Sequence, residues 1–243
     1  YVAAYSVKSQ VSLSSQRAKS QQCTAYGVGG DFFRFHNYEL ISGSYLMENS
    51  IANDQVVIDE EAAWKIFGAI EVDGMTLTYN GKEYIVQGVV KPQDGYKAKA
   101  GGAESGTVFF PLEAIGQDAD CYEIIFPNPV SGFALKQVKG AFTSCGYSED
   151  DIRIIDNSER YSFVNSAKRV LKWTDKGMAF KALKYPYWEN SAIAVENIVD
   201  LLTFFRIIFI IPPIAIVIIS VICFHPIHRL KLLILRIVEH FRK

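Results

Sequence analysis

The sequence predicts an α+β domain that is followed by a long apolar helix. Three observations carry this prediction. Short runs of β-branched and aromatic residues alternate with helical patterns through most of the chain. Two of these runs flank Asn80-Gly81, a dipeptide preferred in the type I′ turn of an antiparallel hairpin. Near the C-terminus, the 18 residues of 207–224 carry no charge.

The charges divide the chain into two unlike parts. The 243 residues have a net charge of −1 and a mean hydropathy of +0.10. Residues 1–200 hold 19 basic and 25 acidic residues, whereas 201–243 hold six basic residues and one acidic residue. A charge of −6 in the first part therefore nearly cancels a charge of +5 in the second. The composition excludes a disordered chain and a dense disulfide scaffold, and a pI near 6.5 gives no general attraction to nucleic acid.

The clearest helix of the first part is expected to begin after Asp59. The run 56–58 reads as a short buried strand, and Asp59 is placed to cap the helix that follows it. Glu60 and Glu61 lie in the first turn, where negative charge suits the helix dipole. Gly68 is expected to end this helix.

The other elements of the first part alternate in the same way. They are a hairpin with strands at 75–79 and 82–90, a polar loop at 91–106, strands at 107–111, 121–126 and 152–155, and helices at 133–145 and 164–173. The strand–helix–strand order within 121–155 is that of a βαβ unit. The loop 91–106 contains four glycines and is expected to be mobile at the surface, the alternative being a contact with a partner.

The uncharged run near the C-terminus is expected to cross a membrane. A bilayer core of about 30 Å needs roughly 20 apolar residues in a helix. The run reaches 24 residues when 201–206, with the single charge of Arg206, is added to it. Pro212-Pro213 should kink this helix.

The charged residues on either side of the run predict its orientation. Glu189, Glu196 and Asp200 precede it, and five basic residues follow it. The positive-inside rule then places the C-terminus in the cytoplasm and the first part of the chain outside. Because the chain begins at Tyr1 and not at Met, we expect an upstream signal or membrane helix.

The segment before the run is expected to form a stalk. A helix over 189–224 would be about 54 Å long, which exceeds the bilayer core. Tyr185-Pro186-Tyr187-Trp188 has the composition of an interfacial aromatic belt, but that placement would push Glu189, Glu196 and Asp200 toward lipid. We therefore interpret this segment as a packed start to the stalk.

The last residues form a basic amphipathic stretch. Its apolar residues recur at helical spacing and are Ile227, Leu230, Leu233, Ile234, Ile237, Val238 and Phe241. The favoured interpretation is a helix on the membrane surface, and the alternative is a contact helix for a cytoplasmic partner. The chain is thus divided into an extracytoplasmic domain at 1–185, a stalk and transmembrane helix at 186–224, and a cytoplasmic segment at 225–243.

An ordered set of motifs in the first part resembles a known family. The motifs are GGDFF at 29–33, YELISGSYL at 38–46, VVIDEEAAWKIFG at 56–68, VDGMTL at 72–77, YIVQGVV at 84–90 and VFFPL at 108–112. Together they resemble the MacB-like periplasmic core domain of ABC transporter permeases in the MacB/FtsX-like group. The resemblance covers residues 25–115 closely and extends as topology to about residue 160. Ser44 departs from it, because the family usually has Arg at this position.

The resemblance implies a function for the chain. Members of this group hold the domain outside the membrane, between a first and a second transmembrane helix, and couple cytoplasmic ATP hydrolysis to its movement, in efflux, lipoprotein extraction or signalling. The implied partners are a separate ABC ATPase subunit, a second permease subunit or a second copy of the chain, and the lipid bilayer, but no nucleic acid. A full permease continues through two more spans, so the chain is either truncated or a shorter relative. The alternative function is a membrane-anchored binding or scaffold module without a transport partner.

The sequence selects no catalytic residue. It has no G-x-x-x-x-G-K-[ST] motif, so the ATPase of such a system must be another chain. His36 is the one histidine before the span, and an anchored enzyme that used it as a base is the third, disfavoured hypothesis. His225 and His228 lack an evident third metal ligand. The acidic groups 59–61 and 149–151 suit a helix start and a solvated turn. We therefore assign no catalytic, cofactor-binding or metal-binding residue.

The four cysteines offer one candidate disulfide. Cys121 begins an expected strand and Cys145 ends the expected helix after it, so a helix that folds back would bring both to one end. An extracytoplasmic location permits oxidation. The alternative is two free thiols. Cys223 lies within the span, and nothing pairs Cys23.

Overall fold

The structure is a computed structural model. It describes residues 1–47, 53–148, 152–172 and 186–241, without the side chains of 224–230, 232–233, 235–236, 238–239 and 241. The described residues fall into two compact units. The first comprises Tyr1–Asp156 and Ala179–Ala192, and the second comprises Asn157–Met178 and Ile193–Lys243. A mixed sheet domain in the first unit and a long helix that extends through the second confirm the predicted α+β class.

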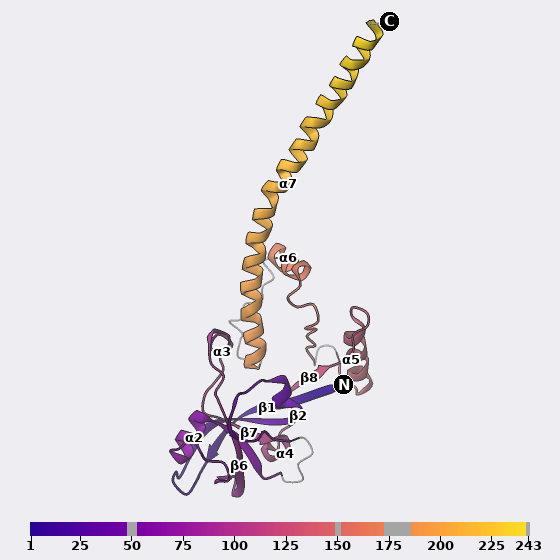
Figure 1. The fold of residues 1–243 in the computed structure, drawn as a ribbon. Coiled ribbons are helices and arrows are strands. Elements are labelled where there is room, and N and C mark those ends of the chain that lie inside the picture. Colours follow the sequence, from indigo (N-terminus) through magenta and orange to yellow (C-terminus); the bar gives the residue numbers. More distant parts are fainter. Residues whose placement is uncertain (48–52, 149–151, 173–185, 242–243) are drawn as a thin grey trace. The chain divides into compact units, whose positions relative to one another are not determined.

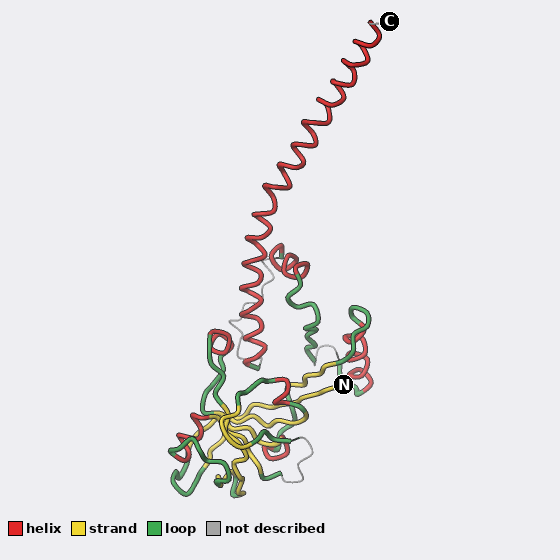
Figure 2. Tube along the Cα trace, in the orientation of Figure 1, coloured by secondary structure: helices red, strands yellow, loops and turns green. Residues whose placement is uncertain are grey.

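The first unit is built on a mixed sheet of eight described strands (Figures 1 and 2). The strands are β1 (Val2–Leu13), β2 (Gln21–Gly30), β3 (Leu40–Gly43), β4 (Gln55–Asp59), β5 (Thr76–Tyr79), β6 (Lys82–Val90), β7 (Thr107–Pro111) and β8 (Cys121–Ile125). Their order is β3-β6-β4-β7-β2-β1-β8, and β5 pairs with β6 outside this path. The pairs β2/β7 and β4/β6 are parallel, and the others are antiparallel.

Five helices accompany the sheet in the described part of this unit. They are α1 (Phe32–Phe35), α2 (Glu60–Phe67), α3 (Tyr96–Gly101), α4 (Leu112–Ile115) and α5 (Phe133–Ser144). Two further helices are α6 (Phe163–Leu171), in the second unit, and α7 (Tyr187–Phe241), which begins in the first unit and continues in the second.

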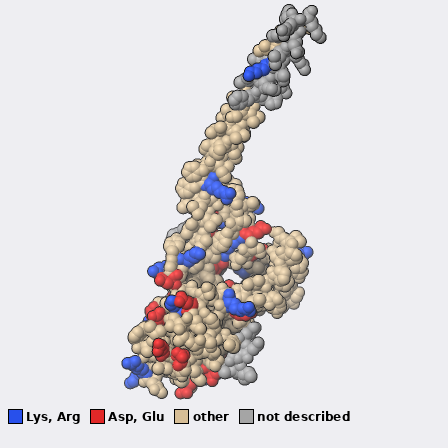
Figure 3. Space-filling model, in the orientation of Figure 1, with Lys and Arg blue, Asp and Glu red and all other residues tan. Residues whose placement is uncertain are grey.

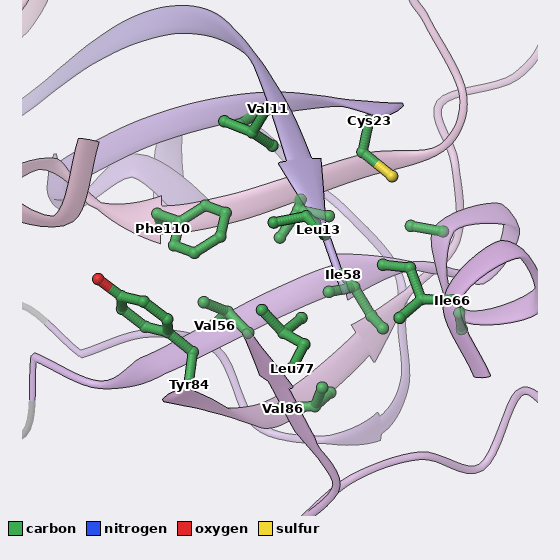
Figure 4. Packing of buried hydrophobic residues seen from close by; sticks show 14 of the residues in the cluster. Val11, Leu13, Cys23, Val56, Ile58, Ile66, Leu77, Tyr84, Val86 and Phe110 are labelled. Carbon is green, nitrogen blue, oxygen red and sulfur yellow. The ribbon is translucent and has the colours of Figure 1, made fainter. Parts of the chain in front are cut away.

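The central strands bury both of their faces. Along β4, Val56 and Ile58 belong to one apolar cluster, whereas Val57 between them belongs to another. The period of two residues along a strand explains this alternation. The first cluster contains Ile66 of α2 and Ile115 of α4, so these helices cover that face, and Figure 4 shows Ile58 beside Ile66 within it. The second cluster includes Phe32 of α1 and has the first turn of α7 packed against it.

The elements with the strongest local signals are confirmed. The side chain of Asp59 accepts a hydrogen bond from the backbone N–H of Ala62 at 2.7 Å, and Gly68 ends α2 in the left-handed conformation. Asn80 and Gly81 connect β5 and β6 with φ angles of 49° and 79°. Two positive φ angles at these positions are what a type I′ turn requires.

Three predictions about the first unit were wrong or incomplete. The range 91–106 is not a continuous loop, because it contains α3. Residues 152–155 do not form a strand, so the expected βαβ unit is absent from the described residues. The strands β1 and β2 were not predicted; some of their buried positions hold small or polar residues, such as Ala4, Ser6 and Thr24, which weaken the apolar pattern.

Helix α7 is one element of 55 residues. It contains the predicted stalk and span and continues beyond them. It passes Pro212 and Pro213 without a break in its helical assignment, and its axis curves in Figure 1. Within it, Tyr187–Cys223 is long and apolar enough to cross a membrane. Figure 3 shows the middle of α7 without acidic or basic side chains. The side chains of most of the predicted amphipathic stretch, including Ile227, Leu230, Leu233, Val238 and Phe241, lie outside the described residues.

Candidate functional site

The most elaborate side-chain arrangement of the first unit is the place where α7 begins. Tyr187 and Trp188, in the first turn of α7, pack against the second apolar cluster of the sheet. Their main neighbours come from β2, β7 and the segment around α1 and are Tyr26, Phe32, His36, Tyr38 and Phe109. We call these seven residues the docking site. The interpretation of 185–188 as a packed start to the stalk is confirmed for Tyr187 and Trp188, and Tyr185 lies outside the described residues.

Trp188 forms the centre of the docking site. Its ring centroid lies 4.2 Å from that of His36, 5.9 Å from that of Phe32 and 6.0 Å from that of Tyr26. Edge and tilted aromatic pairs at such distances stabilise a contact by about 0.5–1.5 kcal/mol each beyond the burial of their surface. The tryptophan therefore ties the first turn of α7 to several parts of the sheet domain at once.

His36 is part of this packing. Its Nε2 atom lies 2.6 Å from a carboxylate oxygen of Glu123 on β8, and the residue is 8% exposed. The ring contacts Trp188 and also Phe32, the latter at 4.5 Å between centroids. The structure thus gives His36 the partners of a structural histidine, as expected, and connects β8 through it to the first turn of α7.

Two tyrosine hydroxyls form a second connection within the docking site. The hydroxyl groups of Tyr38 and Tyr187 lie 2.7 Å apart, and Tyr45 donates to the backbone carbonyl of Tyr38 at 2.6 Å. Burial raises the pKa of Tyr187 to about 12 and also raises the pKa of Tyr38. Both hydroxyls therefore remain protonated at neutral pH, so this hydrogen bond does not change with pH in the ordinary range.

Helix α3 holds the next turn of α7. Ser191 donates to the backbone carbonyl of Lys97 at 2.8 Å, and Asn190 donates to that of Gly101 at 3.2 Å. A Cβ atom on Gly101 would lie 2.1 Å from the hydroxyl of Ser191 and 2.4 Å from the backbone oxygen of Tyr187. The close approach of α3 and α7 therefore requires glycine at position 101. The range 91–106 thus contacts the chain's own helix.

A cavity beside the docking site is too small for an organic ligand. Its volume is about 10 Å³, which is room for about one water molecule. Tyr26, Tyr38, Tyr187 and Glu104 line it together with Asp59. Pockets that bind small molecules are usually larger by more than tenfold, at about 300–1,000 Å³. The geometry here supports attachment of a helix and does not support catalysis on a bound molecule.

Asp59 lies at the border between this cavity and the start of α2. One carboxylate oxygen accepts from Ala62 and the other accepts from the backbone N–H of Thr107 at 2.8 Å. Burial raises the pKa of Asp59, and these hydrogen bonds oppose that rise only in part. The side chain connects α2 to β7 by satisfying two backbone donors, which is a structural role.

The second unit contains a group of ion pairs that join α6 and the residues just before it to α7, and we call this group the clamp. Arg169 of α6 donates from Nε to both oxygens of Asp200 at 3.1 Å, and Arg160 donates to Glu196 at 3.0 Å. Arg169 also donates to the backbone carbonyl of Arg160 at 2.9 Å. The side chain of Asp200 is 1% exposed and that of Arg160 is 7% exposed. Because these charges are buried, each depends on its partner.

The clamp explains the acidic residues that precede the span. In the sequence, Glu196 and Asp200 were an argument against placing this segment at the membrane surface. In the second unit both carboxylates are paired with arginines from outside α7, a pairing that no sequence pattern indicated. Arg160 and Arg169 were missed because ion pairs between distant segments leave no periodic signal.

The remaining candidates from the sequence do not come together into a site. Within the described part of the chain, no group of three or more histidine, cysteine, aspartate or glutamate residues is placed to hold a metal. The side chains of His225 and His228 and the acidic group 149–151 lie outside the described residues. Ser44 accepts a hydrogen bond from the Nε2 atom of Gln87 at 2.8 Å.

The proposed disulfide between Cys121 and Cys145 is wrong. Both are free thiols, Cys121 at the start of β8 and Cys145 exposed after α5. The prediction assumed that α5 packs back along the sheet, but none of the residues of α5 is buried. Burial raises the pKa of Cys121 to about 12, which keeps its thiol in the unreactive protonated form.

A family model identifies the family of the chain, and solved structures resemble its fold. The model of the MacB-like periplasmic core domain matches residues 1–142. The crystal structure of the periplasmic region of MacB from Actinobacillus actinomycetemcomitans is similar in fold, with a TM-score of 0.53 and 22% identity over 73% of this chain and 78% of that chain. The extracellular domain of the ABC-type transporter YknZ from Gram-positive bacteria gives a TM-score of 0.47 and 14% identity over 64% of this chain and 81% of that chain. A search of curated proteins gives no match.

Proposed function

Because the chain belongs to the family of MacB-like periplasmic core domains, we propose that it is a non-catalytic membrane subunit of an ABC transporter. In this proposal, a separate ATPase subunit hydrolyses ATP in the cytoplasm. The sheet domain outside the membrane converts that hydrolysis into export, extraction or signalling. The cargo or signal is left open.

The observation that carries the proposal is the course of α7. Its first turn is fixed to the sheet domain by the docking site, and the same helix supplies the apolar segment that is able to cross a membrane. Along this helix the peptide groups are hydrogen-bonded four residues apart, except at Pro212 and Pro213, which have no N–H to donate. In this proposal, movement of the span is passed to the docking site along this helix.

The orientation follows from the charges around the span. Basic residues concentrate after it and acidic residues before it, which favours a cytoplasmic C-terminus and an extracytoplasmic sheet domain. We keep the division into an extracytoplasmic domain at 1–185, a stalk and span at 186–224, and a cytoplasmic segment at 225–243. The cytoplasmic segment would lie on the inner membrane surface, close to the ATPase. A second permease subunit or a second copy of the chain would complete the transporter.

The described residues also fit a subunit without chemistry of its own. The cavity at the docking site is of the size of one water, and His36 is held by Glu123 and Trp188. A lever needs stable contacts between the helix and the domain, which is what the aromatic packing around Trp188 supplies.

The test of this proposal is isolation of the protein from its own membranes in a mild detergent. We expect an ATPase subunit with a G-x-x-x-x-G-K-[ST] motif to be recovered with it. The isolated protein should no longer carry ATPase activity once the complex is dissociated. Isolation of the intact protein without any nucleotide-binding subunit, including after chemical crosslinking in the membrane, would favour an anchored scaffold module and contradict the proposal.

A further inference from the structure

Helix α6 carries an apolar stripe that the described residues of the second unit leave largely exposed. Phe163, Val164 and Leu171 are 44%, 59% and 82% exposed. At 100° per residue, these three side chains lie within about 100° of one another around the helix. The stripe is therefore a continuous surface along one side of α6.

The remaining surface of α6 consists of a side that faces α7 and a basic border next to the stripe. The opposite side faces α7, since Arg169 pairs there with Asp200 and Ser166 is fully buried. Lys168 and Lys172 are exposed and lie along one border of the apolar stripe. A helix with an apolar side, a basic border and a third side fixed to protein has the pattern of a helix that lies in a membrane interface.

The position of α6 along α7 matches the start of the apolar run. The guanidinium group of Arg206 lies 4.7 Å from the ring centroid of Phe163. Arg206 is the last charged residue before the uncharged run 207–224. The apolar stripe of α6 therefore begins at the height where α7 would enter the lipid. Figure 1 shows α6 beside α7.

We infer that α6 is an interfacial helix, whose apolar stripe of Phe163, Val164 and Leu171 inserts into the outer lipid leaflet beside the span. This rests on the proposed crossing of the membrane by α7. The partner is the lipid surface: acyl chains would cover the stripe, and phosphate headgroups would meet Lys168, Lys172 and Arg206. The clamp then has a purpose, because it fixes the interfacial helix to α7 and so sets how deeply α7 sits in the membrane.

The experiment measures which surface meets lipid. The chain, with Cys121, Cys145 and Cys223 replaced by serine and the buried Cys23 retained, is reconstituted into nanodiscs of phosphatidylcholine and phosphatidylglycerol. A single cysteine at Leu171→Cys, Lys172→Cys or Val217→Cys is labelled with an environment-sensitive fluorophore. Lys172, which follows Leu171 as the C-terminal cap of α6, is the matched control, and Val217 reports on the span itself.

The inference predicts that the label at Leu171 has blue-shifted emission and loses intensity when spin-labelled lipids are added. The label at Lys172 should instead be quenched mainly by iodide in the water. If the label at Val217 is quenched by spin-labelled lipid while the label at Leu171 is quenched by iodide, α7 crosses the membrane but the inference about α6 is wrong. If Leu171 is reached by neither quencher, protein covers the stripe, such as a second copy of the chain, and the inference is also wrong. If Val217 is not quenched by lipid, the membrane crossing fails and α6 loses its role with it.

Discussion

Gly101 shows how a single position controls the attachment of α7. It lies in a range whose glycines suggested mobility in the sequence, yet the absence of its side chain is what lets Ser191 and the backbone of Tyr187 approach α3. We expect Gly101→Ala to separate these elements and to weaken the docking by about 1–3 kcal/mol. Hydrogen exchange should then rise at the first two turns of α7.

Gly140→Ala is the matched control for this prediction. Gly140 is also helical, but a Cβ atom there would meet nothing within 4 Å. Alanine at this place should leave exchange at the docking site unchanged and stabilise α5 slightly, because alanine favours the helix. Equal effects of the two substitutions would refute the role of the close approach.

Asp59 predicts a pH dependence of stability. Because burial raises its pKa in the folded state, the folded protein holds this proton to a higher pH than the unfolded chain does. Stability from this group is complete below the unfolded pKa and is lost as the pH rises through the folded pKa. Asp59→Asn cannot lose a proton there, so the wild-type protein should lose thermal stability relative to the variant as the pH rises above the ordinary pKa of an aspartate, about 3.9.

Circular dichroism at several pH values measures this difference as a difference between two Tm values. The variant also gives up one acceptor for the backbone N–H of Thr107, a loss that is the same at every pH. A constant Tm difference across the pH range would show that Asp59 has no raised pKa.

At the scale of elements, the ring of Trp188 makes a large contribution to the docking of α7. Trp188→Ala removes the contacts with Phe32, His36 and Tyr26 and should weaken the docking by about 2–3 kcal/mol. Trp64→Ala is the control, because Trp64 on α2 is 54% exposed. Hydrogen exchange at residues 187–191 should rise for Trp188→Ala alone. Unchanged hydrogen exchange at these residues in Trp188→Ala would contradict the proposed role of the docking site.

The clamp makes a prediction of a different kind. Arg169→Met leaves the buried carboxylate of Asp200 without its main partner and should destabilise α6 by about 3 kcal/mol. The double variant Arg169→Met with Asp200→Leu removes both charges and should recover much of that loss. Lys168→Met, on the exposed side of α6, should have little effect. Exchange of the α6 amides measures all three, and an additive double variant would contradict the pairing.

Elements with local signals could be predicted, and elements that depend on distant partners could not. Asp59, Gly68 and Asn80-Gly81 each determine their own backbone, so α2 and the β5/β6 hairpin were predicted from short stretches. The motifs at 29–112 were enough to identify the family, which the match over residues 1–142 confirms. The helix α3, by contrast, packs against α7 about 90 residues away, and the strand expected at 152–155 has no partner strand within the described sheet.

The candidate site was predictable only in outline. Tyr187 and Trp188 were noticed as aromatic residues before an apolar run. The acidic residues near them favoured packing against protein over a place at the membrane interface. Their partners could not be named, because Tyr26, Phe32 and Phe109 come from separate parts of the chain and meet only when the sheet has formed. The disulfide failed for a related reason: the lengths of a strand and a helix do not determine whether the helix packs on the sheet.

At the scale of the whole molecule, the central claim is that one helix joins an extracytoplasmic domain to the cytoplasmic side. The opposed charges of the two parts, −6 and +5, belong to this arrangement. A net charge near zero conceals it. The same claim underlies the proposed ATPase partner and the interfacial role of α6.

Labelling with a membrane-impermeant maleimide in intact cells tests this claim most directly. Cys145 is exposed in the sheet domain, and Lys231→Cys introduces an exposed thiol after the span; Cys145→Ser isolates the second signal. The account predicts that Cys145 is labelled in cells whose cytoplasmic membrane is intact, and that Lys231→Cys is labelled only after that membrane is permeabilised. Labelling of both sites before permeabilisation, or of Lys231→Cys alone, would contradict it.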